Sequence, residues 1–389
     1  MSLTAPMPQS PDGDVKTDPA EADLPALIVY AVWHPESQQA AILATSLFKT
    51  LCANPDFPAS RGLGIPVRFR TTMSGAEVPR PIPFTAAQRV AVFVFADDLL
   101  VSSPEWRVYV DALTESASPS HWVVPVTMTD PRNLPPALGR RQAIRLEDRP
   151  GDRQEQTLLN HVMNDLCRFL DTQAAKVKVF LSHAKHDGVE ITTAVRRHLR
   201  EAAHLEEFFD TSDIPDGADF ADILRQRAGA LAALLAVQTD TYASREWCRL
   251  EVLAAKRHHV SIVVLSAVER VESRAFPYIG NVPVVRWRGD ESLEALVGVL
   301  LYEVLRNRYF PLRVKAISRD HPLLGDDQVV AYPPELVTVL AYRAELRELG
   351  QSLGRIIYPD PPLGTEELEI LRDFAPDLEP ITPTLLQAT

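Results

Sequence analysis

The segment SREWCRLE, residues 244–251, contains two side chains whose types and spacing suit the stabilisation of a cation. Trp247 and Glu251 are four residues apart, so on a helix they share one face and lie close together. A carboxylate beside an aromatic ring suits an oxocarbenium-like transition state, because the acid supplies negative charge and hydrogen bonds while the ring excludes water. The alternative interpretation is a helix with one core tryptophan and one solvated glutamate.

The chain after residue 175 alternates between strands and helices that would position this pair. Apolar runs predict strands at residues 176–182, 206–210, 231–238, 260–266 and 282–287. Apolar residues that recur every three or four positions predict the intervening helices and a final helix over 293–305. Such alternation produces a parallel sheet covered on both faces, with a ligand crevice beyond the carboxyl ends of the strands. The helix with Glu251 directly follows a strand, so its first turns border that crevice.

Three motifs in this segment resemble those of the TIR (Toll/interleukin-1 receptor) domain family. The first strand and its exit read VFLSHAKHD over residues 179–187, which resembles the opening box of the family. Phe209-Asp210 followed by IPDG at 214–217 resembles the second box, the mobile BB loop. The 244–251 segment resembles the helix that carries the catalytic glutamate in NAD-cleaving bacterial members. The three motifs occur in the family's order and spacing, which makes the resemblance specific.

The resemblance implies an NAD⁺ glycohydrolase or cyclase with Glu251 as its catalytic residue. It assigns substrate contacts to Trp247, Phe220, Ser182 and Lys185, and it places Ile214, Pro215 and Gly217 in the BB loop. NAD⁺ is then the substrate, with no cofactor and no metal, and the products are nicotinamide and ADP-ribose or a cyclic ADP-ribose isomer. His183, Asp187 and Asp210 belong to the same motifs. For these three residues a structural role and a contact with the ligand are both open interpretations.

The resemblance also implies a cellular role. Members of this type act in bacterial immune-type signalling, such as antiviral defence, or in NAD depletion. They self-associate through their TIR domains and build the site across neighbouring protomers, so we expect an oligomer and an activating protein or ligand. The alternative function is a non-catalytic TIR scaffold for protein–protein assembly.

Residues 24–172 repeat the pattern more weakly, with strands at 26–33, 65–70, 90–96 and 123–128 and a closing helix at 155–172. Trp106 falls where Trp247 falls, but Val110 occupies the place of Glu251, and Asp111 is rotated about 100° round the helix. We therefore predict a degenerate TIR-like domain, catalytically silent and used for binding or assembly. The predicted fold class is α/β, with two tandem flavodoxin-like or TIR-like parallel-sheet domains at 24–172 and 176–310.

The two ends of the chain differ from these domains. Residues 1–23 are polar, acidic and proline-containing, which is typical of a disordered tail. Residues 311–389 contain one clear helix at 336–353 between proline-rich stretches. This region is too small for a third α/β domain, so we expect a C-terminal extension, with regulation as one interpretation of its role.

Composition excludes several partners. A net charge of −12 disfavours nucleic acid, which requires a clustered basic surface. No apolar run reaches the length of about 18 residues that a membrane span needs. Cys52, Cys167 and Cys248 lie far apart and outside any metal-ligand spacing, which favours the reducing cytoplasm. The histidine pairs 183/186 and 258/259 lack the further ligands that a metal site requires.

Overall fold

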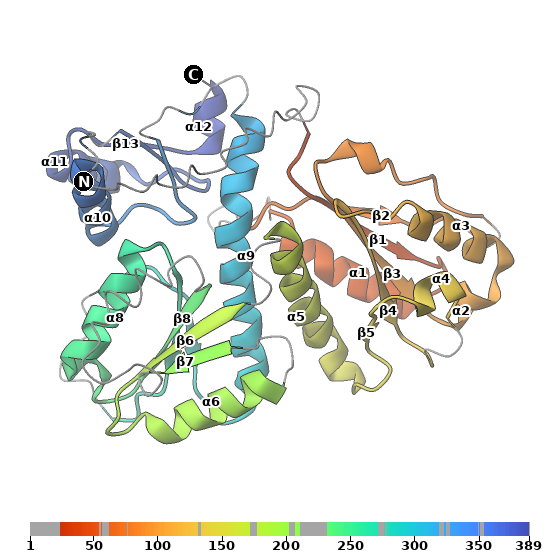
Figure 1. Ribbon diagram of the computed structural model, residues 1–389, viewed down its shortest axis with the longest axis horizontal. Helices are drawn as coiled ribbons and strands as arrows, with labels where there is room; N and C mark the ends of the chain where they lie inside the picture. Colours follow the sequence, from red (N-terminus) through yellow and green to blue (C-terminus); the bar gives the residue numbers. More distant parts are fainter. Residues whose placement is uncertain are drawn as a thin grey trace, which may run out of the picture.

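The computed structural model describes residues 24–388 apart from 54–55, 57–61, 76, 131–133, 172–176, 202–206, 211–231, 271–275, 277, 319–322, 324–326, 349 and 351–353. The described residues form three parallel sheets, two of five strands and one of three. Figure 1 shows the long helix α9 (Leu293–Ile317) between the first sheet on one side and the second sheet and the C-terminal elements on the other.

The first unit is a five-stranded parallel sheet with the order β2-β1-β3-β4-β5. Its core strands are almost wholly apolar, as expected for strands buried on both faces. The strands are β1 (Ile28–Trp33), β2 (Val67–Arg70), β3 (Val90–Ala96), β4 (His121–Thr127) and β5 (Ile144–Arg145). The helices are α1 (Gln38–Leu51), α2 (Asp98–Ser102), α3 (Pro104–Glu115), α4 (Pro136–Gly139) and α5 (Gly151–Leu170), with a 3₁₀ turn at Phe84–Ala86.

The second unit repeats that strand order, because its sheet runs β10-β9-β8-β6-β7. In both sheets the first strand lies between the second and the third, which is the flavodoxin-like order. The strands are β6 (Lys178–His183), β7 (Glu207–Asp210), β8 (Ala233–Gln238), β9 (Ser261–Ser266) and β10 (Val284–Arg286). The helices are α6 (Val189–Glu201), α8 (Glu246–Arg257) and α9, with a 3₁₀ turn at Tyr242–Ser244. The predicted fold class is confirmed.

The two units share one hydrophobic core. Helices α5 and α9 pack side by side between the sheets (Figure 1), and one cluster of buried residues joins Phe93 of β3 to Leu235 of β8. Polar contacts add to this packing: Nη1 of Arg308 donates a hydrogen bond to the carbonyl oxygen of Cys167 over 2.9 Å. The carboxyl edges of both sheets are therefore held in a fixed relation.

Contrary to the expectation that the region 311–389 is too small for a third α/β domain, the C-terminal residues form a small α/β unit. Its parallel strands are β11 (Gln328–Val329), β12 (Arg355–Ile357) and β13 (Glu379–Ile381). Its helices are α10 (Leu336–Glu348), α11 (Thr365–Phe374) and α12 (Pro383–Ala388). Helix α9 also continues through Pro311 and past the domain boundary expected at residue 310. The strands span two or three residues each, so they leave no periodic signal in the sequence.

A polar joint connects this C-terminal unit to α8. Nζ of Lys256, near the end of α8, forms an ion pair and hydrogen bond with Oε2 of Glu335. His259, just after α8, stacks on Tyr342 of α10 with ring centroids 4.5 Å apart, and its Nδ1 lies 2.8 Å from the tyrosine hydroxyl. We call these two contacts the α8 joint.

The α8 joint predicts a pH dependence of stability. Burial, and next the charge of His258, lower the pKa of His259 from 6.5 to about 4. Between these values the unfolded chain binds more protons than the folded chain, so the free energy of unfolding falls as the pH is lowered through this window. One pKa unit corresponds to about 1.4 kcal/mol, so the full loss is on the order of 3 kcal/mol.

Urea denaturation at pH 7 and pH 4.5 measures this loss. His259→Asn is the matched variant, because asparagine tolerates the left-handed backbone found here, with φ of 55°. We expect the variant to lose less stability than the wild type on acidification. An equal loss in both proteins would show that His259 does not titrate as described.

Candidate functional site

The candidate site lies at the carboxyl ends of β6 and β8, where the order of the second sheet reverses. β6 pairs with β7 on one side and with β8 on the other, and the helices that follow β6 and β8 begin at this edge. In open parallel sheets of this kind, ligands bind in the crevice outside the strand ends at such a reversal. Ser182 lies near the end of β6, and Tyr242 follows β8 in the 3₁₀ turn that precedes α8.

Glu251 is buried at this edge in a chain of hydrogen bonds. It occupies the middle of α8 and is 2% exposed. Oγ of Ser182 donates a hydrogen bond to Oε2 of Glu251 and lies 2.7 Å from the hydroxyl oxygen of Tyr242. Because the serine proton is directed to Glu251, the Tyr242 hydroxyl donates to Ser182. A carboxylate this deeply buried requires donors of this kind.

The neighbouring groups are held in their neutral forms. Burial, and next the charge of Glu251, raise the pKa of Tyr242 well above its ordinary value. The same two causes, in the same order, raise the pKa of Cys248 to about 12. The hydroxyl and the thiol therefore keep their protons near neutral pH, and Tyr242 stays a hydrogen-bond donor in the chain that ends at Glu251.

Asp187 anchors the turn that carries Tyr242. Its Oδ1 accepts hydrogen bonds from the hydroxyls of Thr239 and Thr241 over 2.7 and 2.6 Å, and its Oδ2 accepts one from the backbone N–H of Thr241 over 3.1 Å. Burial alone would raise the pKa of Asp187, but these hydrogen bonds outweigh it and lower the pKa below its ordinary value. The motif residue Asp187 thus has a structural role in the described chain.

The other residues singled out from the sequence lie in different surroundings. Trp247 is 61% exposed, so its indole lies at the surface while the Glu251 carboxylate is buried. Ser182 is fully buried rather than part of an exposed loop, and Lys185 is exposed just beyond β6. The remaining predicted residues lie outside the described residues: Phe220 and the BB-loop residues Ile214, Pro215 and Gly217.

Tyr242 is the site residue that sequence reasoning missed. It is fully buried, and its ring lies 5.5 Å from that of Phe276. It lies in a turn, where no apolar periodicity marks a buried position. The available signal was positional: an aromatic residue lies a few residues after a strand whose end borders the crevice.

The first unit has an apolar side chain at one of the equivalent positions and a tyrosine at the other. Val32 pairs with β3 one residue before the last pair of its ladder, as Ser182 does with β8. The structure does not support the predicted match of Val110 with Glu251. The buried row of α3 is Trp106, Tyr109, Val110 and Leu113, and that of α8 is Cys248, Glu251, Val252 and Ala255, so Tyr109 takes the place of Glu251. Val32, Val110 and Trp106 are fully buried in one apolar cluster. The location that holds Ser182 and the hydrogen-bonded Glu251 in the second unit therefore holds Val32 and Tyr109 in the first, with no carboxylate at either position.

The described residues give no support to a metal site or a membrane span. Over the described parts of residues 24–388, no group of three or more His, Cys, Asp or Glu side chains is arranged to hold a metal ion. None of the helices in these ranges combines the length and apolar character needed to cross a bilayer.

Comparison with known proteins identifies the second unit. A family model described as a TIR domain matches residues 179–301, from β6 into α9. These residues are therefore a TIR domain, and the resemblance noted in the sequence is confirmed at this level. A search of curated proteins found no match.

Solved structures give only distant similarity. Tagatose-6-phosphate ketose/aldose isomerase from Escherichia coli is 12% identical, with 72% of this chain and 81% of that chain covered and a TM-score of 0.21. The C-terminal domain of glucosamine-fructose-6-phosphate aminotransferase from Francisella tularensis is 8% identical, with coverage of 73% and 84% and a TM-score of 0.20. Scores this low carry no functional argument.

Proposed function

We propose that this protein cleaves the bond between nicotinamide and ribose in NAD⁺, with Glu251 as the catalytic carboxylate. The products would be nicotinamide and ADP-ribose or a cyclic ADP-ribose isomer, according to whether water or an atom of the substrate attacks. The TIR domain at residues 179–301 supports a signalling or NAD-cleaving function at a coarse level. The buried carboxylate within that domain favours the enzymatic alternative.

The chemistry needs little more than one carboxylate. Nicotinamide in NAD⁺ already carries a positive charge and leaves as a neutral molecule, so no general acid is required. The protein must orient the ribose, stabilise the developing cation and control water. A carboxylate in a poorly solvated site stabilises a cation more strongly than it would in water. Glu251 is suited to this role when the ribose reaches it.

The observation that carries the proposal is the chain from Tyr242 through Ser182 to Glu251. Replacing a buried polar group by hydrocarbon is often neutral or stabilising, so a fold gains little stability by keeping one. The first unit uses Val32 and Tyr109 at the equivalent positions, so a carboxylate is not needed there for this fold. A carboxylate retained at the ligand edge of the second sheet therefore points to a functional demand rather than a structural one.

The second candidate is a non-catalytic scaffold, and one observation favours it. Trp247 and Leu250 are exposed on α8, at 61% and 44%. Large apolar side chains on a surface are typical of contacts between proteins. The two functions are compatible, because TIR domains commonly self-associate. We include in the proposal that assembly of this chain raises its activity.

Chromatography of NAD⁺ incubated with the purified full-length chain tests the proposal. Nicotinamide should appear, and the rate per chain should rise with protein concentration as the chain assembles. A Trp247→Ala variant, which leaves the buried chain of hydrogen bonds intact, should shift this rise to higher concentrations if its surface mediates assembly. Persistent absence of nicotinamide in assembled protein would favour the scaffold and reject the enzyme.

A further inference from the structure

The described part of the C-terminal unit packs against two helices of the second unit, α9 and α8. Its apolar side chains Ile357, Ile381 and Leu386 pack with Phe310 and Val314 near the end of α9. Its polar side chains reach α8 through the α8 joint. Figure 1 shows α12 beside the end of α9 and α10 above α8. The unit is therefore anchored on one helix of the TIR domain and contacts a second, which is the helix that carries Glu251.

The Lys256–Glu335 ion pair is tightly packed by neighbouring backbone groups. Lys256 is 6% exposed and lies five residues after Glu251, about 7.5 Å further along the axis of α8. Oε1 of Glu335 accepts a hydrogen bond from the backbone N–H of Asn281 over 2.9 Å, while Oε2 binds Lys256. Gly280 approaches so closely that a Cβ there would lie 2.5 Å from Oε2 of Glu335 and 2.6 Å from Nζ of Lys256. A side chain here would displace the ends of both ion-pair side chains, and the φ of 62° at Gly280 also favours glycine.

The end of α8 is held in a conformation that depends on its neighbours. His259 has a φ of 55°, in the left-handed region that a non-glycine residue occupies at a cost in free energy. Such a conformation persists where surrounding contacts fix it. Tyr342 stacks on the His259 ring, and Nδ2 of Asn307 donates a hydrogen bond to the His259 carbonyl oxygen over 2.5 Å. One of these supports comes from the C-terminal unit and the other from α9.

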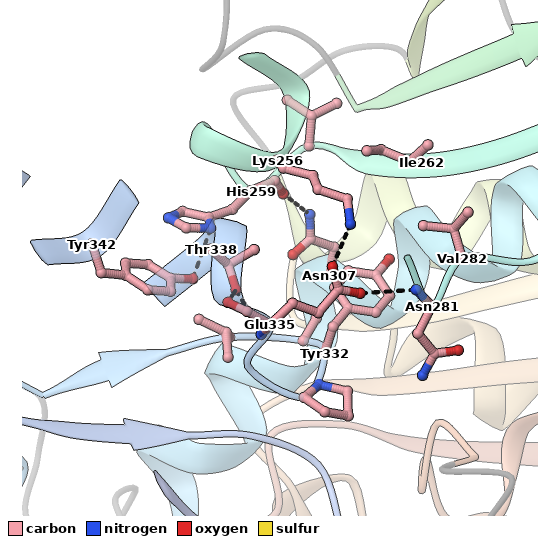
Figure 2. Close-up of a pocket in the computed structure, with 14 residues that line it drawn as sticks. Lys256, His259, Ile262, Asn281, Val282, Asn307, Tyr332, Glu335, Thr338 and Tyr342 are labelled. Carbon is pink, nitrogen blue, oxygen red and sulfur yellow. Dashed lines mark hydrogen bonds and ion pairs between the residues drawn. The ribbon is translucent and has the colours of Figure 1, made fainter. Parts of the chain in front are cut away.

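Figure 2 shows that these polar contacts lie around a cavity between the C-terminal unit and the second unit. The cavity has a volume of about 60 Å³, and its walls include Lys256, Asn307 and Glu335. Packed apolar side chains therefore do not fill this part of the interface. The ion pair and the histidine–tyrosine stack hold α10 against α8, beside the hydrogen bond that the Tyr332 hydroxyl donates to Oγ of Ser261, so changes to these contacts should be transmitted to α8.

We propose that the C-terminal unit braces α8, and that Glu335 and Tyr342 are positioning residues for Glu251. The effect on catalysis rests on the proposed NAD⁺ cleavage, whereas the bracing of α8 does not. Loosening the joint would let α8 shift against β6 and lengthen the hydrogen bond from Ser182 to Glu251. A misplacement of about 1 Å at a reacting group can lower a rate by as much as about 10²-fold.

Charge reversal with a paired swap tests the brace in the full chain. The variants are Glu335→Lys, Lys256→Glu and the double swap. Glu348→Lys is the control, because Glu348 is exposed at the end of α10, the helix that begins just after Glu335. Tyr342→Phe removes only the hydroxyl and keeps the stack. Hydrogen exchange of α8 and the kcat and KM of nicotinamide release are measured in each.

We expect exchange in α8 to rise about tenfold in each single reversal and to fall again in the swap. Recovery would be partial, because the Asn281 N–H loses its acceptor. The value of kcat should fall at least about tenfold with little change in KM, and it should recover with the swap. Tyr342→Phe should show a smaller change in the same direction, and the control none.

Three results would decide against parts of the account. Unchanged exchange of α8 in the single reversals would overturn the brace. Faster exchange with unchanged kcat would overturn the positioning role. Absence of nicotinamide from the wild type would reject the proposed function, while the exchange measurements would still decide whether the C-terminal unit braces α8.

Discussion

Glu251→Gln is expected to lower the rate of nicotinamide release about 10³-fold, which corresponds to about 4 kcal/mol of transition-state stabilisation. Glutamine has nearly the same shape, and its carbonyl oxygen can accept the hydrogen bond that Ser182 gives to Glu251. Folding and NAD⁺ binding should therefore be almost unchanged. What is lost is the negative charge beside the developing cation.

Glu246→Gln is the matched control, because Glu246 is an exposed glutamate in the first turn of the same helix. Its rate should equal that of the wild type. Steady-state kinetics and thermal melting of the three proteins separate loss of charge from loss of fold. Equal rates in Glu251→Gln and wild type would remove Glu251 from the mechanism.

Replacing the hydrogen-bonded chain by apolar side chains is expected to give a stable but inactive protein. The triple variant is Ser182→Val, Tyr242→Phe and Glu251→Val, and the first sheet already has valine, Val32, at the position of Ser182. Exchanging a buried charged network for hydrocarbon of similar volume is neutral or stabilising by about 1–4 kcal/mol. We expect the free energy of unfolding to rise within that range and nicotinamide release to disappear.

The single variants provide the comparison. Ser182→Val alone leaves the buried Glu251 carboxylate without the serine donor and the Tyr242 hydroxyl without its acceptor, which should cost about 1–3 kcal/mol. Urea denaturation of the single and triple variants measures both effects. A triple variant less stable than Ser182→Val would show that the polar chain is retained for stability, contrary to the proposal.

The two large sheets were predictable because their strands leave a clear apolar signal. β3 (Val90–Ala96) and β9 (Ser261–Ser266) are buried along almost their whole length, and the residues between strands show helical periodicity. The strands of the C-terminal unit gave no such signal. β11 contains only Gln328–Val329, and its position in a sheet depends on pairing with β12, which lies distant in the sequence.

The candidate site was predictable in part. The importance of Glu251 followed from its motif, but its spacing from Trp247 suggested a contact that the exposed fractions do not support. Trp247 lies in the first turn of α8, one residue before the inward-facing row that starts at Cys248, whereas Glu251 lies one turn deeper. Helical spacing cannot distinguish these positions. The contacts from Ser182 and Tyr242 arise from tertiary packing that local periodicity does not report.

The most direct test of the central claim is the product analysis of NAD⁺ incubated with assembled wild-type chain and with the folded triple variant. The account predicts nicotinamide and an ADP-ribose product in equal amounts from the wild type, and intact NAD⁺ with the variant. NAD⁺ that stays intact with both proteins, or is cleaved equally by both, would contradict a catalytic role for the carboxylate at position 251.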